Sequence, residues 1–247
     1  MSDQPRLWGE GRSAEFQAKK AKGQFFTPPE VVEFMFEVAG AGAGWSVIDP
    51  ACGDGAFLSQ AVARDCEPVW GVDRDAAALA ACRGRLGERV TLVEQDGLLP
   101  CGREGFDLVI GNPPFSAIRH GVSDPDVMAR FELGQTVKGR APKPPLEVLF
   151  LERFIQLARP GGTVCIILPD GLLANRRQRR VREWMLARCR VAAVVGLPRS
   201  TFRKAATDAK TSILVLRKGA ADSATDAFVA SVARLEELGG VLEGMRG

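Results

Sequence analysis

The sequence predicts an α/β fold, with a mostly parallel seven-stranded sheet, an antiparallel last strand and helices on both faces. Seven short apolar runs alternate with segments of helical periodicity, which is typical of parallel strands joined by covering helices. Carboxylate or amide side chains stand at the ends of several runs, where such sheets bind ligands. The connection before the last run, residues 198–210, is too polar and short for a covering helix, so we expect that strand to be antiparallel.

Composition limits the class of protein. The chain has 247 residues, of which 46% are hydrophobic, enough for one full-sized domain. No apolar run approaches the roughly 18 residues of a membrane-spanning helix, and no signal peptide opens the chain, so we expect a cytoplasmic protein. The six cysteines form no CxxC pair and are expected to be reduced. The single histidine, His120, argues against a Ser-His-Asp triad and against a metal site built on histidines.

Three parts are expected along the chain: a polar arm at residues 1–24, the folded domain at 25–218 and an acidic tail at 219–247. Within the domain, residues 116–145 are rich in Gly, Pro and charge, which is typical of a mobile substrate loop. The tail has a net charge of −3, which leaves +6 for the rest of a chain whose total is +3. Such a mildly basic body fits a polyanionic partner.

The first predicted element is a helix in "FFTPPEVVEFMFEVAG" (25–40). Thr27 is expected at its N-cap, with two prolines in the first turn and Glu30 completing a capping box. The predicted strands follow at 45–50, 68–73, 90–96, 106–113, 163–169, 191–197 and 211–218. The helical segments between them are "FLSQAVARD", "AAALAACRGRL", "LEVLFLERFIQLA" and "QRRVREWMLARC".

A glycine-rich loop follows the first strand in "VIDPACGDGAFL". The strand ends at Asp49, and Gly53 and Gly55 allow the backbone to approach a ligand closely. The third glycine of the nicotinamide fingerprint is missing. A tight strand-to-helix turn without a ligand is the alternative.

Two further carboxylates follow the second and third strands. Asp73 lies 18 residues after Gly55, near the roughly 20-residue spacing at which an acid meets ribose hydroxyls. A helix N-cap is the alternative, for which Asp73 or Asp75 would serve equally. Asp96 stands in "EQDG", where its alternative role is an Asp-Gly turn.

The fourth strand ends in Asn112-Pro113-Pro114-Phe115. The two prolines stop the strand and fix the backbone, so that the Asn112 side chain and the Pro113 carbonyl face outward as acceptors. Phe115 offers a ring on which a planar base can stack. The arrangement suits a planar exocyclic amine. It supplies no general base, and none is needed if the amine attacks a highly activated electrophile.

These three elements together resemble a known family. "GQFFTPPEVVEFM", "DPACGDGAFL" and "NPPF", in this order, are similar to the γ-type methyltransferases that transfer a methyl group from S-adenosylmethionine to N6 of adenine in DNA. The later stretch from "LEVLFLERFIQLARPGGTVCIILPDGLL" to "KTSILVLRK" resembles the modification subunits of type I restriction–modification systems. The resemblance covers about residues 19 to 218 and implies a Rossmann-like, S-adenosylmethionine-dependent methyltransferase fold.

The resemblance also implies roles for individual residues. Phe25, Phe26 and Thr27 would contact the methionine moiety of the cofactor, and Asp73 and Asp96 its ribose and its adenine amino group. The cofactor pocket would be lined by Asp49, Ala51, Gly53 and Gly55. The target amine of an adenine flipped out of DNA would be held by the "NPPF" element, Asn112, Pro113, Pro114 and Phe115.

Two departures from the type I subunits bear on partners. The large helical N-terminal region of those subunits is nearly absent, and no segment after residue 218 is long enough for a target-recognition domain. We therefore expect a separate specificity subunit to choose the DNA sequence. Three alternatives stay open: an RNA adenine or protein glutamine methyltransferase, a non-catalytic nucleic-acid-binding partner of the same fold, and a nicotinamide oxidoreductase, which would leave "NPPF" unexplained.

Overall fold

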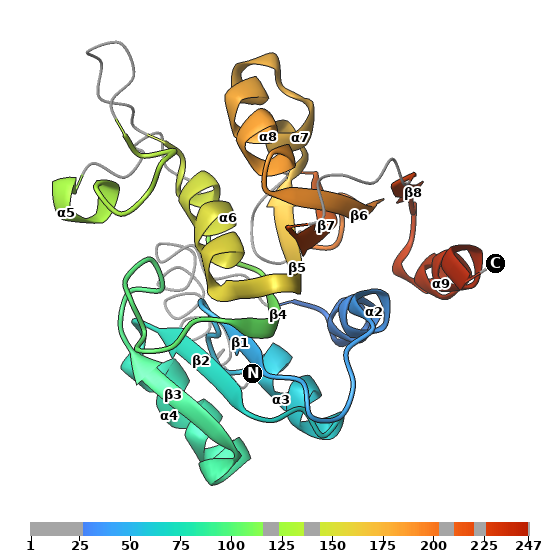
Figure 1. The fold of residues 1–247 in the computed structure, drawn as a ribbon. Coiled ribbons are helices and arrows are strands. Elements are labelled where there is room, and N and C mark those ends of the chain that lie inside the picture. The colour runs from blue at the N-terminus through green and yellow to red at the C-terminus, as the bar shows by residue number, and fades with distance from the viewer. Residues whose placement is uncertain (1–26, 116–123, 136–143, 203–209, 220–225, 247) are drawn as a thin grey trace, which may run out of the picture.

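The computed structural model describes residues 27–115, 124–135, 144–202, 210–219 and 226–246. Their strands form one eight-stranded sheet in the order β3-β2-β1-β4-β5-β7-β6-β8 (Figure 1). All neighbouring pairs are parallel except those of β7, which is antiparallel to both β5 and β6. The predicted α/β class and the antiparallel strand at 211–218 are confirmed. The strand bounds are β1 Val47–Asp49, β2 Val69–Asp73, β3 Val90–Glu94, β4 Phe106–Gly111, β5 Ala158–Pro169, β6 Cys189–Gly196, β7 Thr211–Lys218 and β8 Phe228–Ser231.

Helices cover both faces of this sheet, because successive residues of a central strand point to opposite sides. In β7, Ile213 and Val215 face one hydrophobic cluster, whereas Leu214 and Leu216 face the other. The first cluster holds the apolar faces of α2 Pro29–Ala39, α3 Ala56–Ala63, α4 Ala76–Leu86 and α9 Leu238–Arg246. The second holds those of α6 Leu146–Leu157, α7 Asp170–Ala174 and α8 Arg179–Leu186.

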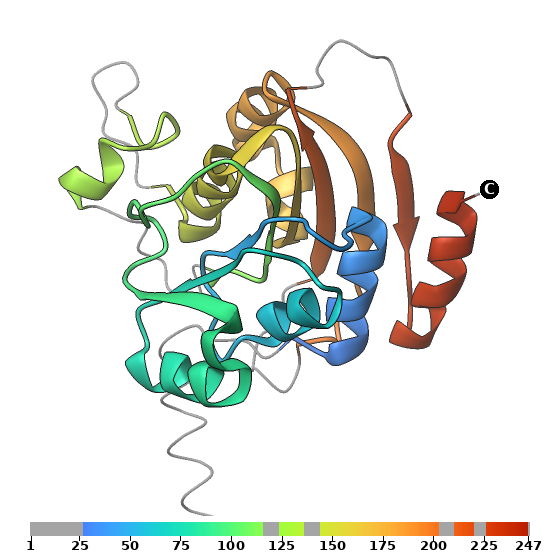
Figure 2. The ribbon, with the colours of Figure 1, turned by 60° about the horizontal axis from the view of Figure 1, so that its bottom comes forward.

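The eighth strand corrects the expected count of seven. Residues 226–246, assigned by the sequence to an acidic tail, add β8 beside β6 and place α9 against α2. Figure 2 shows α2 and α9 side by side. The sequence did not predict β8, because four residues between polar segments carry only a weak local preference for a strand. The strand is stabilised by parallel pairing with β6, which is distant in the sequence.

The start of α2 differs from expectation as well. Pro28, not Thr27, is the N-cap residue, and no side chain caps the helix. The hydroxyl of Thr27 is used elsewhere, as described below. Residues 1–24 lie outside the described residues, and so do two parts of the expected loop, 116–123 and 136–143. Between these two parts, Pro125–Met128 form the short helix α5.

Candidate active site

The site predicted from the sequence lies along one edge of the sheet. Strands β2, β1 and β4 are parallel neighbours, so their carboxyl ends lie side by side. Asp73 ends β2, Asp49 ends β1, and Asn112 directly follows β4. The fold therefore brings these three side chains to a common edge, which is where open α/β sheets bind ligands.

The two glycines of the loop between β1 and α3 do different things. Both have positive φ, +53° at Gly53 and +86° at Gly55, a region that favours glycine. A Cβ at Gly55 would overlap Sγ of Cys82, so this glycine allows α4 to pack closely. A Cβ at Gly53 would meet no atom within 4 Å, so the turn at Gly53 borders open space that a ligand can enter.

Asp73 holds this turn in place. Its Oδ2 accepts a hydrogen bond from the Gly53 backbone N–H at 2.7 Å, and its Oδ1 accepts one from the Asp75 N–H at 2.9 Å. Asp75, in contrast, caps α4 by accepting from the N–H groups of Ala77 and Ala78. The N-cap role that the sequence left open between Asp73 and Asp75 thus falls to Asp75. Asp73 is half-buried, and each carboxylate oxygen has a second lone pair for a further donor.

Asp49 is buried at the centre of the edge, with 1% of its surface exposed. Its Oδ1 accepts a hydrogen bond from the Ala51 N–H at 3.0 Å. A Cβ at Gly111 would lie 2.5 Å from the same oxygen, so β4 carries a glycine where the carboxyl group passes. Burial raises the pKa of Asp49 to about 8; the Ala51 N–H opposes this rise and the charge of Asp73 adds to it. Strong pKa shifts of this kind cluster at functional sites.

Asp96 lies in a turn that packs on the glycine loop. Its Oδ1 accepts a hydrogen bond from the Leu98 N–H at 2.9 Å, as expected for an Asp-Gly turn. A Cβ at Gly97 would overlap the carbonyl oxygen of Pro50, so the turn and the loop are in direct contact. Asp96 is thereby held near the other two carboxylates. Gly97 and Gly111 were not singled out in the sequence, although each directly adjoins a residue that was.

Among the described residues, Asn112, Arg153 and Thr211 each have a buried side-chain polar atom without a hydrogen-bond partner, and of these three only Asn112 belongs to the predicted site. Its Nδ2 donates a hydrogen bond to Oγ1 of Thr27 at 3.1 Å. Thr27 is 5% exposed, so the bond fixes the amide plane inside the protein. Oδ1 of Asn112 is buried and finds no hydrogen-bond donor among the residues that the structure describes. A buried acceptor without a partner is costly, and in native proteins it calls for a ligand, a water molecule or an ion.

The other residues of the "NPPF" element have varied exposure. Pro113 is buried and Pro114 is half-buried. Phe115 is 7% exposed and belongs to the hydrophobic cluster that also contains α2. The segment is therefore packed between β4 and α2. Phe25 and Phe26, predicted to contact a cofactor, lie outside the described residues.

Neither a metal centre nor a membrane span is present in the described ranges. They contain no group of three or more His, Cys, Asp or Glu side chains arranged to hold a metal ion. Within the same ranges, no helix has the length and apolar character needed to cross a membrane.

Comparison with solved structures supports the fold. A Listeria monocytogenes protein assigned to the class I S-adenosylmethionine-dependent methyltransferases superposes with a TM-score of 0.74 at 20% identity, covering 96% of this chain and 77% of that one. The sheet and its helices therefore form the S-adenosylmethionine-dependent methyltransferase fold.

Sequence comparison finds relatives in restriction systems. The EcoEI type I restriction enzyme methylase subunit of Escherichia coli is 25% identical over 228 residues, which cover 83% of this chain and 44% of that subunit. The type II methyltransferase M.TthHB8I of Thermus thermophilus is 33% identical over 157 residues, covering 61% of this chain and 35% of that enzyme. The chain thus spans less than half the length of these curated relatives.

A family model reaches across most of the chain. The model described as N-6 DNA Methylase matches residues 12–68 and 88–237, which include the glycine loop, the "NPPF" element and β8. On this match the chain belongs to the N-6 DNA methylase family.

Proposed function

We propose that this protein transfers a methyl group from S-adenosylmethionine to N6 of adenine in DNA, as the modification component of a restriction–modification or related defence system. The observation that carries the proposal is the buried Oδ1 of Asn112, an acceptor without a partner among the described residues at the end of β4. Family membership and the type I and type II relatives support it.

The side chains and the glycine loop at this edge of the sheet fit S-adenosylmethionine. The open space beside Gly53 suits a ligand that runs along the loop, and Asp73 has lone pairs left for the ribose hydroxyls. Asp96 would accept from the amino group of the cofactor's adenine, and Asp49, Ala51, Gly53 and Gly55 would line the pocket. The Thr27 hydroxyl, which accepts from Asn112, still has its own proton to donate to the methionine carboxylate, beside Phe25 and Phe26.

The acceptor amine would be held by groups fixed in the fold. Oδ1 of Asn112 and the carbonyl of Pro113 would each accept one N6 hydrogen, which orients the nitrogen lone pair toward the cofactor. Bound S-adenosylmethionine supplies an electrophilic methyl group, so no general base is needed before attack. Pro114 would restrict the backbone conformation after Pro113, and Phe115 would stack on the adenine flipped out of the duplex.

A partner follows from the same proposal. Three of the relatives carry type I methylase subunit names, and we propose that a separate specificity subunit selects the DNA sequence. The proposed place of action is the cytoplasm, as expected from the sequence.

Asn112→Ala tests the proposal. The variant should lose methyl transfer by about 10²–10³-fold, the usual effect of removing one positioned group in a desolvated site. Its affinity for S-adenosylmethionine should stay near that of the wild type, because Asn112 faces the acceptor. Tritiated methyl transfer to DNA, RNA and protein is measured in parallel with calorimetry of cofactor binding.

Three outcomes would contradict the proposal. Near-native turnover by Asn112→Ala would remove the assigned role. Transfer to RNA or protein in preference to DNA would change the substrate. Absence of S-adenosylmethionine binding by the wild type would remove the cofactor.

A further inference from the structure

The turn before α8 carries a concentration of positive charge that the proposed chemistry does not use. Four arginines, Arg176, Arg177, Arg179 and Arg180, occur within five residues, in the short helix η2 Arg176–Gln178 and the first turn of α8, and all four are exposed. The nearest acids in the chain are already engaged. Asp170 pairs with Lys210 and accepts from Ser212, and Glu183 pairs with Arg179 at 2.7 Å. Glu183 therefore compensates one of the four arginines, and Arg176, Arg177 and Arg180 have no ion pair among the described residues.

The arginines of this region differ in their contacts. Within the cluster, Arg179 pairs with Glu183, and Arg180 donates to the Glu132 carbonyl at 3.3 Å. Arg182 donates to the carbonyls of Leu172 and Asn175, and Arg188 pairs with Glu132, so these two hold the fold together. The side chains of Arg176 and Arg177 make no hydrogen bond or ion pair with any residue that the structure describes. A need for structural contacts does not account for them.

Their position on the helix is electrostatically unfavourable. The N-terminus of a helix carries a partial positive charge, which favours acids in the first turn and disfavours cations. The first turn of α8 has no acid and two arginines, Arg179 and Arg180, directly after the two in η2. Local rules broken in this way are expected at functional sites, where a ligand supplies the compensation. A ligand that offset this positive charge would be an anion.

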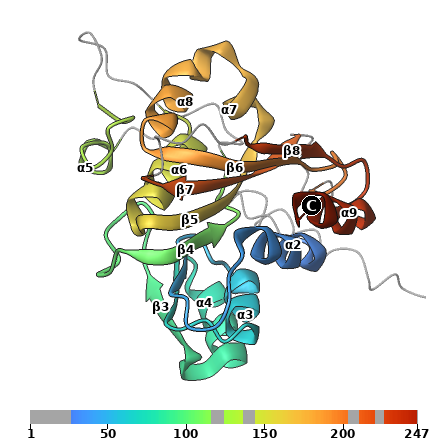
Figure 3. The same ribbon diagram turned by 45° about the vertical axis from the view of Figure 1, so that its right-hand side comes forward.

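The cluster lies at the same edge of the sheet as Asn112. Strand β4 pairs with β5 through Gly111 and Ile166, so Asn112 and the end of β5 at Pro169 leave the sheet together. Helix α7, η2 and the first turn of α8 follow at this edge, and α8 then returns toward β6. In Figures 1 and 3, α7 and α8 stand beside α6, on the far side of the sheet from α4.

We propose that Arg176 and Arg177, supported by Arg179 and Arg180, bind the phosphodiester backbone of the DNA duplex that flanks the target adenine. This inference rests on the proposed function, because it takes the duplex as the molecule that approaches Asn112. Planar guanidinium groups match phosphate oxygens in geometry and charge. Phosphate contacts at this edge fix the duplex in position while the base enters the site.

The experiment compares two neutralising double variants. Arg176→Gln with Arg177→Gln removes two charges from the cluster. Arg83→Gln with Arg89→Gln is the matched control; it removes two exposed charges from α4 and from the residue before β3, at the opposite edge of the sheet. Binding of the whole chain to a duplex of defined sequence is measured at a series of salt concentrations, without turnover. Cofactor affinity and melting temperature serve as folding checks.

The cluster variant should reduce the slope of log K against log salt by about 0.9 for each DNA phosphate that is no longer neutralised, close to 2 for both. The control should keep the wild-type slope, and both variants should keep wild-type cofactor affinity. In turnover, the cluster variant should raise KM for duplex DNA and leave kcat unchanged.

Equal slopes for the cluster variant and the control would overturn the proposal. An effect seen only with an RNA duplex would reassign the surface to RNA. Failure of the proposed function is distinguishable, because binding is measured without turnover. If the wild type transfers no methyl group to DNA but the cluster variant still changes the slope, the proposed DNA-binding surface stands and the proposed activity is contradicted.

Discussion

Asp73 and Asp75 are two residues apart and hold different parts of the molecule. Asp73 ties the glycine loop to the end of β2, and Asp75 caps α4. The sequence offered either residue for the N-cap role, since both follow an apolar run and precede a helix. The hydrogen bond from Gly53, 20 residues away, separates them.

Replacing each of these acids should therefore give different results. Asp73→Ala should weaken S-adenosylmethionine binding by roughly 1.5–3 kcal/mol, the value of charge-assisted hydrogen bonds. Asp75→Ala should leave cofactor affinity unchanged and lower the free energy of unfolding by about 1 kcal/mol, the usual cost of losing an N-cap. Calorimetry and urea denaturation measure the two quantities. Unchanged affinity in a folded Asp73→Ala variant would reduce Asp73 to a structural residue.

Asp49→Asn should alter how stability depends on pH. The folded-state pKa of Asp49 is raised from its ordinary value of 3.8 to about 8, so the folded protein keeps a proton that the unfolded chain releases. That contribution is complete below the unfolded pKa and is lost as the pH rises toward 8. Asparagine keeps the shape and the acceptor for Ala51 but has no such proton.

The free energy of unfolding of the wild type, relative to that of Asp49→Asn, should therefore fall with rising pH. The slope should reach at most about 1.4 kcal/mol per pH unit across the window between the two pKa values. Urea denaturation of both proteins at a series of pH values measures it. A difference that stays constant with pH would show that Asp49 is ionised in the folded protein.

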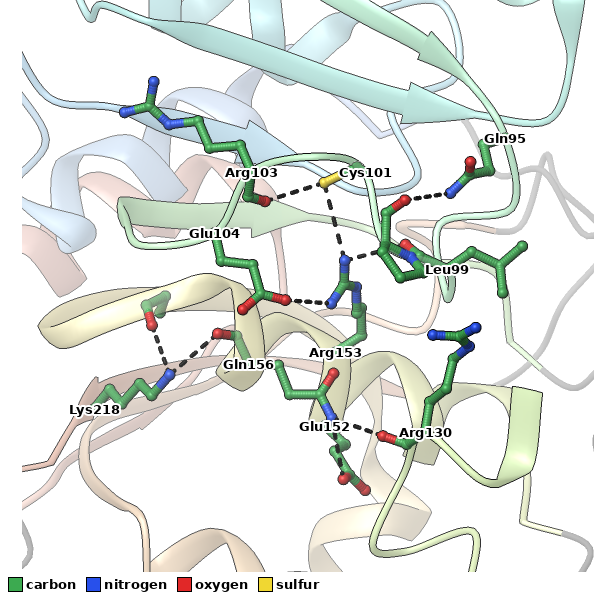
Figure 4. Close-up of polar contacts among 12 residues, drawn as sticks. Gln95, Leu99, Cys101, Arg103, Glu104, Arg130, Glu152, Arg153, Gln156 and Lys218 are labelled. Carbon is green, nitrogen blue, oxygen red and sulfur yellow. Dashed lines mark hydrogen bonds and ion pairs between the residues drawn. The ribbon is translucent and has the colours of Figure 1, made fainter. Parts of the chain in front are cut away.

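At the scale of elements, α6 is anchored on both sides by buried charged residues (Figure 4). Arg153 donates to the Leu99 carbonyl and pairs with Glu104, which holds the β3–β4 connection. Glu152 is 1% exposed and accepts from the backbone N–H groups of Glu132 and Leu133 at 2.7 and 2.9 Å. The described residues 124–135 of the expected loop are thus docked on the helix.

Glu152→Ala should release that docked segment. Two backbone N–H groups would lose their acceptor, each at a cost of about 1–3 kcal/mol if it stays buried. Amide hydrogen exchange at Glu132 and Leu133 should accelerate at least about tenfold, while β5 remains protected. Gln156→Ala is the comparison variant: Gln156 lies one turn later and donates to the Arg130 carbonyl and to Oε1 of Glu152, each at 3.3 Å, but accepts no hydrogen bond from the two N–H groups. Equal exchange in both variants would mean that Glu152 does not hold the segment.

At the scale of the whole molecule, residues 226–246 extend the same sheet and the same core. The Val232 N–H donates to the Gly196 carbonyl, and Leu238 is 4% exposed within the cluster that holds α2. Val229 is 72% exposed on the outer edge strand. A segment whose apolar residues join the main core should unfold with it.

Leu238→Ala therefore tests the unity of the fold. The substitution should lower the free energy of unfolding by about 2–5 kcal/mol in one cooperative transition, as expected for a buried leucine. Val229→Ala should change it by less than about 0.5 kcal/mol, because that side chain is exposed. Denaturation followed by circular dichroism and by tryptophan fluorescence measures both. A separate early transition for Leu238→Ala would make residues 226–246 an independent unit.

The sequence by itself determined the class of fold, seven of the strands and the carboxylates at the sheet edge. Each of these depends on periodicity or turn chemistry within about ten residues, which the chain displays locally. The order of the strands, with β7 between β5 and β6, was decided by packing among distant segments. So was the pairing of β8 with β6, since four residues carry too weak a local preference to specify a strand.

The candidate site divides in the same way. The residue types that suit a planar amine and a ribose were visible as motifs. The partner of Thr27 was not, because its hydroxyl meets Asn112 across 85 positions of sequence instead of capping the adjacent helix. That bond satisfies the amide nitrogen and leaves Oδ1 without a donor among the described residues. A hydrogen bond between remote segments depends on the whole fold, and only the tertiary structure decided it.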